Sequence, residues 1–152
     1  MAGAAPTVSR GTIVIDTTPL RKLAGVLRAA APDAARTMRL ALKTAGGIVA
    51  VEAAARASWS ETIPGSIRVQ TAGTTVKVTA GKGLSSPIAT LYENGGEPGS
   101  WRHPVWGNTD NWVSQQARPF LAPALEAKSE EVAAAAGDAI AEGWRALGLD
   151  VL

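Results

Sequence analysis

One stretch of the chain, Gly99 to Leu125, holds three of the five Trp residues, the single His and the single Phe. It has the pattern of a large aromatic loop that continues directly into the start of a helix. Loops lie at the surface of proteins, where clustered apolar side chains are costly in water. Such a loop therefore either packs back onto its own domain or contacts a partner.

Length and composition indicate a single folded domain. The 152 residues are enough to bury a core, and 46% hydrophobic and 18% charged residues are typical of a globular protein. The net charge of +2 is too small for a dedicated nucleic-acid binder with a dense basic face. The absence of Cys excludes disulfides, thiolate metal sites and cysteine nucleophiles.

Membrane insertion and export are not expected. No stretch approaches the roughly 20 apolar residues that span a bilayer, and the first residues carry no apolar signal segment. We expect a soluble protein that is made in a cytoplasm.

The first part of the chain predicts one strand and two helices behind a flexible arm. Residues 1–10 are small and polar, as in a loose N-terminal arm, and residues 11–152 form the single domain. The β-branched run Gly11 to Asp16 predicts a strand. A short amphipathic helix is expected from Thr18 to about Ala30, and a long one from Asp33 to about Trp59.

Two adjacent glycines, Gly46 and Gly47, lie in the middle of the long helix. Each costs about 1 kcal/mol relative to Ala in a helix interior. We therefore expect them to permit a close contact with a helix or a sheet, or a bend.

The central part predicts a β-hairpin. Residues 66–70 and 74–79 alternate apolar and polar side chains around Gly73. The run Ile88 to Glu93 is too short to assign as helix or strand. Residues 95–117 are expected to form the extended aromatic loop, with Trp112 and Val113 as candidates for a short strand.

The C-terminal part predicts one long amphipathic helix over residues 119–147, with Gly148 as its stop. Together these elements predict an α+β fold. A small antiparallel sheet packs against two N-terminal helices and one long C-terminal helix.

Motifs for catalysis and cofactor binding are incomplete. Ala80 to Gly83 (AGKG) lacks the glycine spacing and the Ser or Thr of a phosphate-binding loop, and Pro87 stands where a nucleophile elbow needs its second Gly. A small hydrolase built on Ser100 and His103 is one alternative. A lone His in an aromatic loop is more often a packing residue, so we expect no enzyme activity. The carboxylates are scattered along the chain, so we also expect no metal and no cofactor.

The three Trp residues of the aromatic loop have two interpretations, a small satellite core under the loop or a set of interface anchors. We favour anchors, because a domain of this size does not need so many aromatics in one loop. The predicted partner-binding residues are Trp101, Arg102, His103, Trp106, Trp112 and Phe120.

Several segments together resemble one known family. They are Tyr92 to Gly96 (YENGG), Arg102 to Gly107 (RHPVWG) and Arg118 to Leu125 (RPFLAPAL), placed after a helical first half and a hairpin and before a C-terminal helix. This arrangement, from about Leu20 to Leu147, is similar to the neck, or head-tail joining, proteins of long-tailed bacteriophages.

The resemblance implies a structural role in the virion and no enzyme activity. Copies assemble into a ring, of six subunits or alternatively twelve, between the portal complex and the tail, after synthesis in the host cytoplasm. The implied partners are further copies of the chain, head-closure or connector proteins, and tail terminator or tail tube proteins. DNA passes through the ring without sequence-specific binding. A tail terminator ring that caps the tail tube is the nearest alternative.

Overall fold

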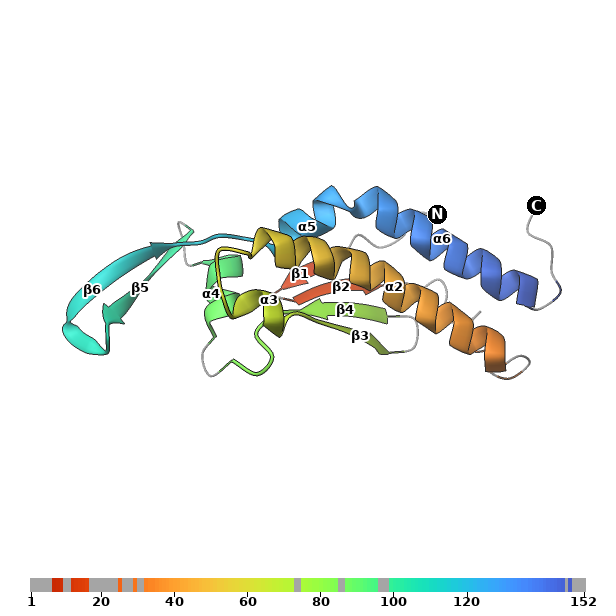
Figure 1. Cartoon of the computed structure of the whole chain (residues 1–152), viewed down its shortest axis with the longest axis horizontal. Coiled ribbons are helices and arrows are strands. Elements are labelled where there is room, and N and C mark those ends of the chain that lie inside the picture. Colours follow the sequence, from red (N-terminus) through yellow and green to blue (C-terminus); the bar gives the residue numbers. More distant parts are fainter. Residues whose placement is uncertain are drawn as a thin grey trace.

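The computed structural model describes residues 7–9, 12–16, 25, 29, 32–72, 75–84, 87–95, 99–146 and 148. They form an elongated α+β domain from which one two-stranded arm projects (Figure 1). The elements, in chain order, are β1 (Thr7–Ser9), β2 (Thr12–Asp16), α2 (Pro32–Arg56), α3 (Ile63–Ser66), β3 (Arg68–Ala72), β4 (Thr75–Thr79), α4 (Ile88–Asn94), β5 (Ser100–Val105), β6 (Asn108–Gln116), α5 (Leu121–Ala127) and α6 (Ser129–Ala146).

A four-stranded antiparallel sheet, in the order β1-β2-β4-β3, forms one layer of the domain. Both β2 and β3 pair with β4 along its five residues. Val76 and Val78 of β4 are buried and Lys77 between them is exposed, so one face of the sheet at β4 meets the helices and the other faces solvent. The predicted strand before Asp16 and the predicted hairpin are confirmed.

Helix α2 lies directly on the apolar face of this sheet because Gly46 has no side chain. A Cβ atom built at Gly46 would lie 2.5 Å from Cγ1 of Val76 and 2.8 Å from Cγ1 of Val69, closer than real Cβ atoms approach. The close helix-sheet contact expected from the glycine pair is thus confirmed for Gly46. A Cβ atom at Gly47 would meet nothing within 4 Å, so this second glycine has no such role.

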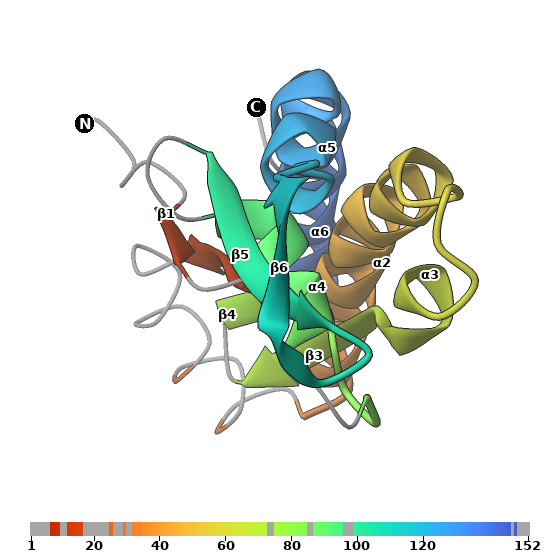
Figure 2. The same cartoon turned by 90° about the vertical axis from the view of Figure 1, so that its left-hand side faces the viewer.

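Helix α6 runs antiparallel beside α2 and completes the helical layer over the sheet (Figures 1 and 2). Small residues face each other along this contact, and Ala139 of α6 clusters with Ala35 of α2 and with Val76 of the sheet. Small side chains allow two helices to pack closely.

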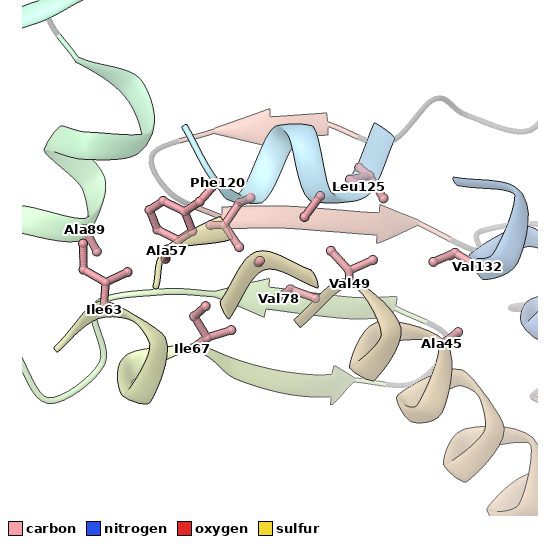
Figure 3. Packing of buried hydrophobic residues seen from close by; sticks show 13 residues of the cluster. Ala45, Val49, Ala57, Ile63, Ile67, Val78, Ala89, Phe120, Leu125 and Val132 are labelled. Atoms are coloured by element: carbon pink, nitrogen blue, oxygen red, sulfur yellow. The ribbon is translucent and has the colours of Figure 1, made fainter. Parts of the chain in front are cut away.

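The main core fills the space between α2, α5 and the sheet, and Figure 3 shows its 13 residues. Phe120, Leu121 and Ala124 enter it from the start of α5 and are completely buried. The other members are Ala45, Val49, Ala53, Ala57, Ile63, Ile67, Val78, Ala89, Leu125 and Val132.

Two predictions of local structure are corrected, and one run that the sequence does not assign is a helix. The expected aromatic loop is a β-hairpin, β5–β6, of which the sequence offers only Trp112 and Val113 as candidates for a strand and predicts no cross-strand pairing. The expected single C-terminal helix is divided at Lys128, whose φ of −111° and ψ of 10° end α5, and the Ser129 hydroxyl donates to the carbonyl of Glu126 there. The run Ile88 to Glu93, which is too short to assign from its sequence, lies in helix α4 (Ile88–Asn94).

Part of the expected N-terminal arm is a strand. Thr7–Ser9 pairs antiparallel with β2, and the remaining residues up to position 11 lie outside the described residues. The helix expected from Thr18 to Ala30 also lies outside them, apart from Gly25 and Ala29, which are helical.

Candidate assembly surface

The β5–β6 hairpin projects from one end of the domain, well beyond the helices and the main sheet (Figure 1), and lies in front of them when that end faces the viewer (Figure 2). Its strands pair antiparallel from Ser100 opposite Gln116 to Pro104 opposite Trp112. Eight of the nine residues of β6 are exposed. A two-stranded hairpin is marginally stable by itself in water, so a long, exposed arm of this kind is a candidate for stabilisation by a partner.

The turn at the tip of the hairpin consists of Trp106 and Gly107. Val105 pairs with Asn108 across it, and φ is 52° at Trp106 and 78° at Gly107. Positive φ at both positions is the pattern of a type I′ turn, in which Asn-Gly is favoured. Trp106 is the one non-glycine residue with positive φ among those described, and its side chain is 99% exposed.

The base of the hairpin is attached to the domain by three aromatic rings. Trp101 lies edge-on to Tyr92, with ring centroids 4.8 Å apart, and Tyr92 lies edge-on to Trp59 at 4.5 Å. The guanidinium of Arg118 lies over Trp59, 5.4 Å from the ring centroid. The aromatic stretch is therefore divided, because Trp101 packs on its own domain whereas Trp106 does not.

The two faces of the hairpin carry different residues. Arg102 and Trp112 share one face, with the guanidinium 6.0 Å from the indole centroid, and Trp112 is 46% exposed. Trp101 and His103 lie on the opposite face because strand side chains alternate. His103 is half-buried, and its Nδ1 lies 3.3 Å from the carbonyl oxygen of Pro104.

The pairing also separates the residues of the alternative hydrolase site. Ser100 and His103 are three residues apart on one strand, which directs their side chains to opposite faces of the hairpin. The strand therefore does not place the Ser100 hydroxyl beside the His103 imidazole.

Phe120 is a correction to the predicted partner-binding set. Its side chain is 0% exposed and belongs to the core, so it has no surface to offer a partner. Of the remaining predicted residues, Arg102, Trp106 and Trp112 are exposed, and Trp101 and His103 are half-buried.

Glu93 holds the base of the hairpin from inside, and no local sequence pattern predicts this role. Its carboxylate accepts hydrogen bonds from the backbone N–H groups of Phe120, Leu121 and Ala122, each at 2.8 Å, although Glu93 is only 5% exposed. These donors lie at the N-terminus of α5, where backbone N–H groups lack partners within the helix. In the sequence, Glu93 is marked only by its membership of the Tyr92 to Gly96 segment.

A second surface feature is an open groove of about 480 Å³ beside α2. Gly47, Ile48 and Val51 of α2 form its apolar part, and Glu52, Lys128 and Glu131 supply polar groups. Lys128 Nζ lies 2.8 Å from Glu131 Oε2, and this hydrogen bond raises the pKa of the ammonium above its ordinary value.

Within the described part of the chain, no group of three or more His, Cys, Asp or Glu side chains is arranged to hold a metal ion. No helix among the described residues is long and apolar enough to cross a bilayer. The fold and surface define an α+β protein with a projecting hairpin arm. Comparison with known protein families, curated proteins and solved structures gives no match.

Proposed function

We propose that this protein is a structural subunit of the neck of a long-tailed bacteriophage. Copies form a ring that joins the portal or connector complex to the tail and continues the DNA conduit. The proposal starts from the resemblance of the Tyr92 to Gly96, Arg102 to Gly107 and Arg118 to Leu125 segments to that family.

The observation that carries the proposal is the projecting hairpin with Trp106 at its tip. The indole is 99% exposed in the isolated chain, which is unfavourable in water and suits an anchor that is buried on assembly. Arg102 and Trp112 add a cation and a second indole on one face of the arm. Tyrosine, tryptophan and arginine are the residue types that dominate interface energetics.

The firm attachment of the arm to the domain agrees with this role. The aromatic contacts of Trp101 and Tyr92 and the hydrogen bonds of Glu93 fix the base of the hairpin. A rigid arm loses less conformational entropy on binding than a flexible loop does.

A ring also requires two different surfaces on each subunit that meet head to tail. The hairpin occupies one end of the elongated domain, and the groove beside α2 is a separate surface. The net charge of +2 suits a conduit, because a strongly basic lumen would retain passing DNA through many phosphate contacts.

The test is a phage that lacks this protein, imaged for its particles. The proposal expects filled heads and finished tails that are not joined, and restoration of joining when the wild-type chain is supplied. Normal joined particles in its absence would contradict the proposal. Labelling of the chain in complete particles distinguishes the neck from the tail terminator alternative. Label between the portal complex and the tail supports the neck, whereas label on the ring that caps the tail tube supports the terminator.

A matched pair of variants tests the arm itself. Trp106→Ala is expected to abolish ring formation and tail attachment, whereas Lys77→Ala, on the solvent face of the sheet, retains both. Ring formation and attachment by Trp106→Ala at the wild-type level would exclude the hairpin tip as an assembly surface.

A further inference from the structure

Helix α2 carries apolar residues on two faces, and only one of them is covered by its own domain. The covered face contains Met38, Leu42 and Val49, each no more than 2% exposed. The other face contains Leu40, 59% exposed, and Val51, 73% exposed. Leu40 and Val51 are 11 positions apart, which is close to three helical turns, so both lie on the same side of α2.

Gly47 lies on this uncovered face and forms part of the groove between α2 and the start of α6. Unlike Gly46, it makes no close contact that would exclude a side chain, since a Cβ atom there would meet nothing within 4 Å. Glycine lowers the stability of a helix interior. Because Gly47 has no side chain, the groove is deeper between the flanking side chains of Thr44 and Val51.

We propose that this groove receives Trp106 from the hairpin tip of a second copy of the chain. The inference rests on the proposed ring and names the two surfaces that meet in it. Contact between a hairpin tip and a groove is heterologous, as a closed ring requires.

The chemistry of the groove matches an indole. Ile48 and Val51 supply apolar contact for the ring, and a buried indole N–H needs an acceptor. Glu52 and Glu131 line the same groove. Each carboxylate has two oxygens, so each has acceptor capacity beyond its ion pair with Arg56 or Lys128.

Size and charge allow the same occupant. The groove is open to solvent and has a volume of about 480 Å³, within the roughly 300–1,000 Å³ of pockets that bind small molecules. Its two carboxylates are each paired with a cation, Glu52 with Arg56 and Glu131 with Lys128, so the groove carries no net charge that would oppose a neutral indole.

The occupant belongs to another copy because the hairpin of the same chain points away from the helices (Figure 1). Trp106 also adopts a positive φ of 52°, which is unfavourable for a bulky side chain. Backbone strain at an exposed aromatic tip is typical of a residue selected for binding.

Disulfide cross-linking tests the contact directly, because the chain has no Cys of its own. Full-length Asn108→Cys and Val51→Cys chains, which both keep Trp106, are mixed and oxidised at concentrations where the wild type self-associates; Asn108 is exposed and directly follows the turn at the hairpin tip. The expected product is a mixed dimer that forms about tenfold faster than the dimer of Asn108→Cys with Lys77→Cys, because docking of Trp106 raises the local thiol concentration. Equal rates for the two pairs would overturn the inference.

A variant that keeps Trp106 supplies an independent test. Gly47→Leu fills the groove with a good helix former, and is expected to lower self-association at least tenfold while the thermal midpoint stays at or above that of wild type. Gly137→Leu, at an exposed glycine of α6 with nothing within 4 Å of its Cβ position, is the matched control and retains self-association. Normal rings from Gly47→Leu would contradict the groove as the docking site for Trp106 but would leave the proposed ring function standing. If the wild-type chain does not self-associate at all, either alone or on phage particles, the proposed function is contradicted as well.

Discussion

The carboxylate of Glu93 accepts a hydrogen bond from the backbone N–H of Phe120 at 2.8 Å, across 27 residues of chain. The hairpin β5–β6 lies entirely within this interval. A second bond, from the N–H of Arg118 to the carbonyl of Tyr92 at 2.9 Å, closes the same loop. The two ends of the arm are thereby held together at the edge of the core.

Replacing Glu93 by Ala is expected to destabilise the fold strongly. Three buried or half-buried N–H groups at the start of α5 would lose their acceptor, and leaving such groups unpaired costs about 3 kcal/mol or more in total. For a chain of this size, this lowers the thermal midpoint by roughly 6–12 °C. Circular dichroism during heating measures the change.

The matched control for Glu93 is Glu126→Gln on the exposed side of α5, which is expected to leave the midpoint within about 1 °C. Glu93→Gln retains one carbonyl acceptor and should fall between wild type and Glu93→Ala. A Glu93→Ala protein as stable as the Glu126→Gln control would show that the N–H groups find another partner.

The elements with strong periodicity were predictable from the sequence, and the contacts between elements were not. The alternation of Val76 and Val78 with polar neighbours indicates a strand with one buried face, and the structure agrees. The hairpin was less visible because Pro104 and Gly107 interrupt its pattern, and Phe120 was misassigned because its aromatic neighbours in sequence are at the surface. The role of Glu93 depends on a helix 27 residues away, which no local pattern contains.

Gly46 and Gly47 are expected to respond in opposite directions to the same substitution. Gly46→Ala gains about 1 kcal/mol of helix propensity, but its Cβ atom would lie 2.5 Å and 2.8 Å from two Val side chains. Val side chains have restricted χ1 rotamers, and overpacking of this kind costs about 1–3 kcal/mol. The net result is a destabilisation of about 1 kcal/mol in urea unfolding.

Gly47→Ala has no such contact within 4 Å and is expected to stabilise the isolated chain by about 0.5–1 kcal/mol. The two variants differ only in position, so each is the control for the other. Equal stabilities would mean that α2 shifts away from the sheet to accommodate the methyl group.

Trp101→Ala is expected to loosen the hairpin without unfolding the domain. It removes the edge-on contact with Tyr92, at 4.8 Å between centroids, which is worth about 0.5–1.5 kcal/mol beyond the buried area. Backbone amides of residues 100–116 should then exchange faster with deuterium, whereas those of α2 should be unchanged. Trp112→Ala, which lacks this contact, serves as the comparison, and equal exchange in the two variants would argue against the aromatic attachment.

Trp106→Asn separates the stability of the hairpin from its proposed function. Asn-Gly is a favoured pair for a type I′ turn, and replacing a bulky residue at a φ of 52° relieves about 1 kcal/mol of backbone strain. The isolated chain should therefore unfold at the same or a higher urea concentration than wild type. Self-association, measured by light scattering, should nevertheless be lost, because the apolar anchor at the tip is absent.

Trp106→Phe keeps an aromatic side chain at the same position and should retain part of the association. A Trp106→Asn chain that is less stable than wild type and still assembles would contradict both the turn strain and the anchor, since the tip would then be a structural requirement of the monomer.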